Sequence, residues 1–332
     1  MVLDNNPFTS ETYNQEWVNS YLKGEKCYKF NFIEGVAFTK NRYLPLYTNI
    51  GKYKSCGISY SLNHGETKDD YKGKVFVLYD IPSYLPSIQT GEVGLKSITQ
   101  YKGYGIDLAD YKTINDYLQK FSRNRKRSLI KGLRKLEKDY DIEYVWLEKV
   151  DKVEFDKVFN TLFELIDETF KQKKTINSHS IKKVKSWYKS LFFKLINEGK
   201  AAFFIIKNSK EVIAVSFNYF SNNIFFAAIP SYNRKYREYG IGNIQMLKEM
   251  EWSINHNLEY YDLGKGSYGY KQIWASEEYS FEYHILYDRK NWLSKIIANF
   301  LCFYFSLKAF LRVLKQRFFT KVRSILKNDS KK

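Results

Sequence analysis

Hydrophobic and polar residues follow different periods along the chain, and these periods predict most of its helices and strands. Up to about residue 110, short aromatic and β-branched runs such as 74–79 alternate with glycine-containing turns, which predicts a mixed domain with several short strands. From 113 to 140, apolar residues recur at helical spacing among many basic residues. We expect that helix to link the two halves of the chain.

Beyond residue 140 the predicted elements follow one another closely. A strand at 142–147 and two helices come first, and three strand-like runs follow. The last of these runs, 224–229, is apolar on both faces and is therefore predicted to be central and buried. Pro230 closes that run, and Gly240 opens an amphipathic helix. A strand at 258–263, a short helix at 268–275 and an alternating strand at 281–287 complete the order β-α-α-β-β-β-α-β-α-β.

A glycine-punctuated turn joins the central strand to the helix that follows it. Residues 234–243 read Arg-Lys-Tyr-Arg-Glu-Tyr-Gly-Ile-Gly-Asn. Backbone N–H groups at a helix N-terminus favour a bound pyrophosphate, and glycines let the anion approach the backbone. The alternative is an ordinary turn with a solvated basic face. The predicted binding residues are Arg237, Tyr239, Gly240, Ile241, Gly242 and Asn243, together with Ala227 and Ile229 on the preceding strand.

This turn resembles the Arg/Gln-x-x-Gly-x-Gly/Ala coenzyme A loop of the GNAT acyltransferase superfamily, which has it at the same place in the order of elements. A closer resemblance is to the CelD/BcsL-type branch, which is linked to cellulose and surface polysaccharides and is akin to the FemAB peptidyltransferases. The segments that carry it are Asn6-Pro-Phe-Thr-Ser with Trp17, the basic helix 121–140, and the Asp-x-Gly…Tyr-Lys-x-x-Trp pattern from Asp262 to Trp274. The resemblance implies an α+β GNAT fold in two GNAT-like units, of which the N-terminal one is degenerate.

The resemblance also implies a division of the chain and an activity. The expected parts are an N-terminal mixed domain at 1–112, a basic linker helix at 113–140, a GNAT acyltransferase domain at 141–288 and a basic amphipathic segment at 289–332. The implied activity is direct, metal-free transfer of an acyl group, most simply acetyl, from acyl-CoA to an amine or hydroxyl of a cell-envelope or polysaccharide-related acceptor. Two alternatives stay open: FemAB-like aminoacyl transfer from charged tRNA, and a non-catalytic GNAT-fold subunit of a polysaccharide system.

Direct transfer to an amine needs a group that takes the proton of the amine, donors for the oxyanion and an acid for the departing thiolate. By resemblance, Tyr270 is the first candidate acid and Tyr268 the second. Lys271 corresponds to the lysine that FemAB-like proteins place beside the transferred carbonyl. Asp262 is a candidate base or, alternatively, the cap of the next turn. Ordinary packing of the tyrosines and a surface position of the lysine are the structural alternatives.

The net charge of +18 indicates a surface that concentrates anions such as nucleic acid, phosphorylated cofactors or anionic lipid. The basic run 123–135 could contact RNA or an acidic substrate, or simply form a solvated helix face. Three distant cysteines and four isolated histidines give neither a disulfide framework nor metal-ligand spacing. The N-terminus has no basic start followed by an apolar run, so we expect a cytoplasmic protein.

The C-terminal segment 289–332 has twelve lysine and arginine residues against one acidic residue, Asp329. Its longest uncharged apolar run, 296–307, is shorter than the roughly 20 residues that span a bilayer. We therefore expect the segment to lie on the inner, anionic face of a membrane or, alternatively, to pack on the domain as an ordinary helix.

Overall fold

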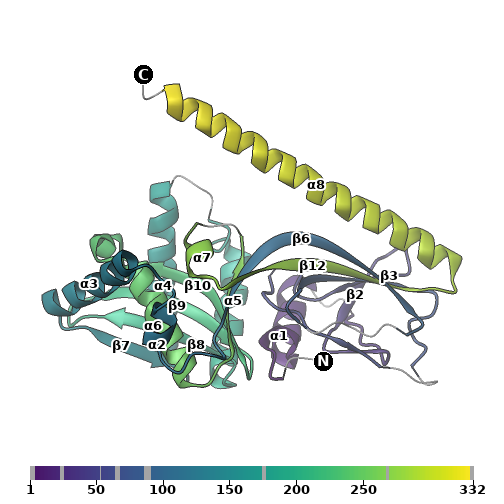
Figure 1. The fold of residues 1–332 in the computed structure, drawn as a ribbon. Coiled ribbons are helices and arrows are strands. Elements are labelled where there is room, and N and C mark those ends of the chain that lie inside the picture. Colours follow the sequence, from purple (N-terminus) through teal and green to yellow (C-terminus); the bar gives the residue numbers. More distant parts are fainter. Residues whose placement is uncertain are drawn as a thin grey trace. The chain divides into compact units, whose positions relative to one another are not determined.

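The structure, a computed structural model of the chain, describes residues 4–22, 26–52, 54–63, 68–85, 91–173, 177–266 and 269–329. The chain forms two units whose segments interleave along the sequence (Figure 1). The first unit comprises Cys27–Lys102 and Ser280–Lys332, and the second comprises Val2–Lys26 and Gly103–Tyr279.

A mixed sheet in the order β6-β11-β10-β9-β8-β7 forms the centre of the second unit. Its strands run antiparallel to their neighbours, except that β10 and β11 are parallel. The strands are β6 (Val93–Asp107, which enters this unit at Gly103), β7 (Glu143–Leu147), β8 (Ala201–Lys207), β9 (Val212–Phe220), β10 (Ile224–Tyr232) and β11 (Tyr260–Lys265).

Helices cover both faces of this sheet. On one face α6 (Ile241–Asn255) packs Met250 against Phe225 and Tyr261 of the central strands. On the other face α4 (Lys152–Lys173) and α5 (Lys182–Asn197) provide an aromatic layer, in which Phe192 stacks on Phe217 with ring centroids 3.5 Å apart. The remaining helical segments are η1 (Pro7–Thr9), α1 (Glu11–Trp17), η2 (Val18–Leu22), α2 (Ile114–Leu118), α3 (Arg123–Asp139), η3 (Arg234–Tyr239) and α7 (Gly269–Trp274).

The order of elements predicted for residues 142–287 is confirmed, and two local predictions are wrong. The helix predicted from 113 to 140 is two helices, because Ser122 accepts a hydrogen bond from the backbone of Arg125 and starts α3 as a separate helix. Pro230 does not end β10, which continues to Tyr232. The exposed Pro230 remains opposite Ser216 of β9 in the ladder.

The main strands of the first unit belong to the same ten-stranded sheet, in the order β2-β3-β5-β12-β6, with β3 and β5 parallel. Its elements are β1 (Ile33–Glu34), β2 (Phe38–Lys40), β3 (Leu46–Asn49), β4 (Ser61–Leu62), β5 (Val75–Pro82), the first part of β6, most of β12 (Glu277–Asp288) and α8 (Trp292–Asp329). The start of α8 closes the core: Ile297, Ala298 and Phe305 pack on Val75 and Tyr283. The prediction of an α+β fold with a large mixed sheet is confirmed.

Helix α8 corrects the expectation that the C-terminal segment is too short to cross a membrane. By length and composition, Trp292–Lys315 is long and apolar enough to do so. The expectation counted only the uncharged run, whereas the helix continues through Lys308 and Arg312.

The domain boundaries predicted from the sequence treat each domain as one continuous stretch. The observed units differ from them: residues 103–140 belong to the second unit, α8 belongs to the first, and two further segments are also assigned differently. Residues 4–26 belong to the second unit, where Tyr13 of α1 packs on Trp187 of α5 with ring centroids 5.8 Å apart. Residues 280–288 of β12 belong to the first unit, where they pair with β5.

Candidate functional site

The parallel strands β10 and β11 separate after a short stretch of pairing. They pair only over Ile224–Phe226 and Tyr260–Asp262, although β10 continues to Tyr232 and β11 to Lys265. The β10 ladder also shifts register between Ala227 and Ile229. Ala227 keeps accessible surface even though its strand lies inside the sheet. We call these separated ends, residues 227–232 and 263–265, the fork.

Helix α6 begins directly after the fork strand β10 and the short η3 turn. Gly240 is its N-cap, with φ 72° and ψ 36°, and it has no side chain to accept from the first turn. This left-handed conformation is unfavourable for a residue with a Cβ, so the position requires glycine. A Cβ on Gly242 would lie 3.5 Å from the Tyr232 ring, which is an ordinary contact. Of the two predicted loop glycines, therefore, the backbone requires only Gly240.

A pocket of about 360 Å³ lies at the start of α6. It is formed by the α6 turn and by helix α3, which supplies Lys131 and Lys135. The two elements come close because residue 132 is glycine: a Cβ there would lie 2.5 Å from the Tyr239 carbonyl oxygen. The lining residues are Ser128, Leu129, Lys131, Gly132, Lys135, Glu238, Tyr239, Gly240, Asn243, Ile244 and Leu247.

The participation of α3 in this pocket was missed by the sequence analysis, which treated the helix as a linker. Besides the Gly132 approach, the Lys135 amine pairs with Glu238 at 2.9 Å and lies 4.7 Å from the Tyr239 ring centroid. The Tyr239 hydroxyl in turn donates to Asp139 at 3.0 Å. A lone glycine inside an otherwise regular basic helix was the available signal, because such a glycine usually marks close packing.

The other predicted binding residues have distinct positions. Arg237 is exposed on η3, and the Ile241 side chain is buried in the core, so only the backbone of Ile241 can face a ligand. The Asn243 side chain accepts a hydrogen bond from the Trp274 indole at 3.2 Å. Ile229 is buried on β10. The hydrogen bond between Trp274 and Asn243 connects the loop to α7, the short helix after β11.

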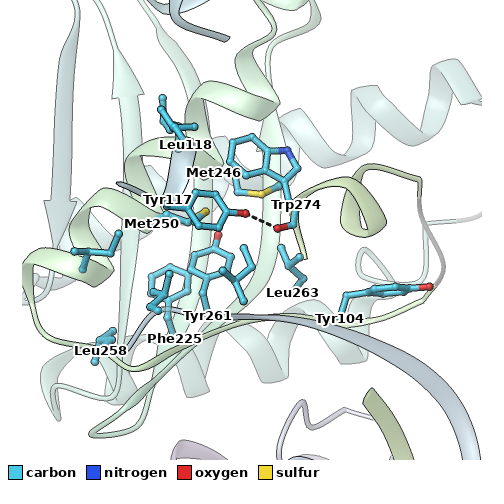
Figure 2. Packing of buried hydrophobic residues seen from close by; sticks show 14 of the residues in the cluster. Tyr104, Tyr117, Leu118, Phe225, Met246, Met250, Leu258, Tyr261, Leu263 and Trp274 are labelled. Atoms are coloured by element: carbon cyan, nitrogen blue, oxygen red, sulfur yellow. Dashed lines mark hydrogen bonds between the residues drawn. The ribbon is translucent and has the colours of Figure 1, made fainter. Parts of the chain in front are cut away.

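Helix α7 is held in place by α2 and by Lys120, which follows that helix. The hydroxyl of Tyr117 and the amine of Lys120 both donate to the Trp274 carbonyl oxygen. Figure 2 shows Tyr117 with its dashed hydrogen bond to Trp274, together with Met246 and Leu263 in the same cluster. Burial, with a smaller contribution from the charge on Arg125, lowers the pKa of Lys120 to about 8. These contacts fix α7 beside the start of α6.

The predicted catalytic residues cluster around the end of β11. Lys271 is buried, and its amine donates to the carbonyl oxygens of Gly264 at 3.2 Å and Lys265 at 2.7 Å. The buried Asp262 carboxylate accepts from the Gly264 N–H at 2.6 Å and from the Tyr279 hydroxyl at 2.5 Å. Both side chains therefore hold the backbone of β11 where it separates from β10.

Tyr270 differs from these residues because 43% of it is exposed. It lies on α7, one residue before Lys271. Tyr268 lies outside the described residues. The catalytic roles of all four residues remain predictions.

A buried carboxylate that the sequence analysis missed links the strands on both sides of β10. Glu249 of α6 accepts from the Tyr261 hydroxyl of β11 at 2.6 Å and from the Ser216 hydroxyl of β9 at 2.5 Å. Asn218 of β9 donates to the same carboxylate at 3.4 Å. Burial raises the pKa of Glu249 to about 7, although these hydrogen bonds act in the opposite direction. In the sequence, the available signal was the pair Ser216 and Asn218, two polar residues at alternate positions of the otherwise apolar β9.

Part of the second unit matches a known protein family by sequence. Residues 123–272 match the family model described as acetyltransferase (GNAT) domain, which covers less than half of the chain. No curated protein matches the chain. Among the described residues, no group of three or more His, Cys, Asp or Glu side chains is arranged to hold a metal ion.

Several solved structures share the fold. FemX has a TM-score of 0.56 at 11% identity, over 83% of this chain and 91% of FemX. A conserved protein of unknown function from Bacteroides thetaiotaomicron has a TM-score of 0.51 at 10% identity, over 86% of this chain and 92% of that one. The C-terminal domain of a putative lysylphosphatidylglycerol synthetase from Agrobacterium fabrum has a TM-score of 0.50 at 9% identity, over 88% and 96%.

At these identities the structural likeness shows the fold alone. The predicted GNAT fold is confirmed, and residues 123–272 match a model of the acetyltransferase (GNAT) domain. Assignment to the CelD/BcsL-type branch and the degenerate GNAT character of the N-terminal unit remain predictions.

Proposed function

We propose that this protein is a GNAT-type acyltransferase that moves an acyl group, most simply acetyl, from acyl-CoA to an amine or hydroxyl group. One observation carries the proposal: the pocket at the start of α6 combines the Gly240 turn with Lys131 and Lys135. The match of residues 123–272 to the acetyltransferase model supports the same reaction class. The resemblance to the CelD/BcsL-type branch supports a cell-envelope or polysaccharide-related acceptor.

The residues around the pocket fit the pyrophosphate of coenzyme A. The first N–H groups of a helix lack acceptors within the helix and carry a partial positive charge. At α6 those groups belong to Ile241 and Gly242, and no side chain of Gly240 covers them. Lys131 and Lys135 of α3 line the adjoining pocket, where Glu238 pairs with Lys135. In this proposal an anion at the helix start accepts from the backbone N–H groups and is attracted by the charge of Lys131.

The residues around the end of β11 fit the transfer step. Bound acyl-CoA supplies a thioester whose C–S bond breaks as the C–N or C–O bond to the acceptor forms. In this proposal Tyr270 gives its phenolic proton to the departing sulfur, the proton of the acceptor passes to solvent, and the tyrosinate regains a proton from solvent. Lys271 and Asp262 act as positioning residues, because their hydrogen bonds fix Gly264 and the end of β11.

Calorimetric titration with acetyl-CoA and with CoA tests the donor site. Gly240→Val should abolish binding, because a branched side chain strains the left-handed position and covers the N–H groups. Arg237→Ala should weaken binding less, by about tenfold or somewhat more, since it removes one charge-assisted contact. Gly199→Val is the matched control: Gly199 also has a left-handed φ, of 69°, and open space around it, but it lies after α5. Equal binding by both valine variants would contradict the assignment.

A second candidate is aminoacyl transfer from charged tRNA, which the basic face of α3 favours. Arg127, Lys131, Arg134, Lys135 and Lys138 line an open groove of about 410 Å³ next to the donor pocket. The fold likeness to FemX is consistent with this candidate. Filter binding with deacylated and charged tRNA decides between the two. Retention of tRNA at physiological salt, without heat from millimolar acetyl-CoA, would make tRNA the donor.

A further inference from the structure

Helix α8 has two apolar faces, and only one of them packs on protein. Ile297, Ala298 and Phe305 face the core of the first unit. Further along, the Arg312 guanidinium donates to the Gln100 carbonyl oxygen at 2.6 Å and lies 4.1 Å from the Tyr101 ring centroid. These contacts fix the rotation of the helix about its axis over more than four turns.

The other face carries large apolar side chains at spacings of three and four residues. Trp292 is 70% exposed and Phe303 is 67% exposed. The exposed row is Trp292, Ile296, Phe300, Phe303, Leu307 and Phe310. A scattered exposed leucine is normal on a soluble protein, but a continuous apolar row over about five turns marks an interaction surface.

The charge around this row indicates what it meets. Lys295, Lys308 and Lys315 are exposed on the same helix, and residues 289–332 contain Asp329 as their one acidic residue. An apolar row on a basic helix complements an anionic lipid surface, where the rings enter the acyl boundary and the long lysine side chains reach the headgroups.

We propose that α8 binds in the plane of an anionic lipid bilayer through its Trp292–Phe310 row. A spanning orientation does not fit, although the helix is long enough. The opposite face of α8 is packed on the first unit, so the helix cannot enter the hydrocarbon without leaving that core. The inference is independent of the acyl donor.

Co-sedimentation of the full-length protein with vesicles tests the proposal. Removing α8 would expose the core of the first unit, so point variants are preferable. The test variant is Phe303→Glu/Phe310→Glu. The matched control is Tyr43→Glu/Val153→Glu, which makes the same charge change at positions that are 83% and 81% exposed on other elements. Vesicles of phosphatidylcholine alone and with about 30% phosphatidylglycerol vary the lipid charge.

We expect wild type and control to bind the anionic vesicles, and the α8 variant to bind at least about tenfold more weakly. Binding to neutral vesicles should be much weaker. Equal partitioning of the α8 variant and the control overturns the proposal. So does equal binding to neutral and anionic vesicles. Light scattering without lipid completes the test. The proposal is also overturned if the wild type self-associates, the α8 variant is monomeric, and neither protein sediments with vesicles. In that case the row binds a second copy of the chain. Acetyl-CoA titration of the same samples reports the donor site separately.

Discussion

Replacing Glu249 with glutamine should remove most of the pH dependence of the stability of the second unit above pH 5. The carboxyl is fully buried, and its pKa in the folded protein is about 7, against 4.5 for an ordinary glutamate. The folded state therefore holds this proton more tightly than the unfolded state. The corresponding stability is fully present below pH 4.5 and is lost as the pH rises through 7.

The magnitude follows from the difference between the two pKa values. At about 1.4 kcal/mol per unit, the wild type loses about 3 kcal/mol in total, of which about 2.5 kcal/mol falls between pH 5 and pH 8. Glutamine cannot ionise, so the variant should lose none of this. Its oxygen can accept from Tyr261, and its amide can donate to Asn218 Oδ1, which lacks a partner in the structure. The variant should therefore be more stable than the wild type at pH 8.

Urea unfolding at pH 5, 6, 7 and 8 measures the effect. Five of the six tryptophans lie in the second unit, so tryptophan fluorescence follows mainly its unfolding. Glu251→Gln is the control on the same helix, where the carboxylate pairs with Lys248 at 2.9 Å near the surface and contributes little. The reasoning is refuted if wild type and Glu249→Gln lose stability in parallel between pH 5 and pH 8.

Two further predictions concern the donor pocket and the fork. Gly132→Ala should lower the melting temperature and weaken acetyl-CoA binding, because a clash with the Tyr239 carbonyl of about 1–3 kcal/mol exceeds the gain of about 1 kcal/mol in helix propensity; a rise in melting temperature would show that α3 does not press on the loop. Tyr270→Phe should lower kcat far more than it weakens acetyl-CoA binding, since the phenolic proton acts mainly in the transition state. Lys271→Ala should have the same pattern, because it removes the hydrogen bonds that position the end of β11. Steady-state kinetics on an identified acceptor measures this, and wild-type turnover in both variants would exclude the assignment.

The sequence predicted the regular elements of residues 142–287 because their signals are local. Alternation in β9 and the apolar stripe of α6 depend on neighbours within a few residues. The role of Gly240 at the start of α6 could be predicted for the same reason, since a glycine directly before a helix is a local backbone signal.

The rest depends on partners that are distant in the sequence. Gly132 meets Tyr239 more than a hundred residues later, and nothing in the α3 pattern identifies that partner. The sequence around Lys271 did not show whether this lysine lies at the surface or is buried against two carbonyl groups, because its burial depends on the path of β11. Glu249 was hidden in an amphipathic helix, where a glutamate normally faces water.

The interleaving of the two units has a consequence for the order in which they fold during synthesis. Residues 27–102 leave the ribosome early, but the strand that pairs with β5 and the α8 side chains that cover Val75 come only after residue 280. About 200 residues separate the two segments, which corresponds to about 10–40 s of translation at typical rates of about 5–20 residues per second. The second unit is complete at Tyr279 and so can fold first. The early-made strands must wait with their apolar faces uncovered, and they are the part of the nascent chain that a chaperone would need to shield.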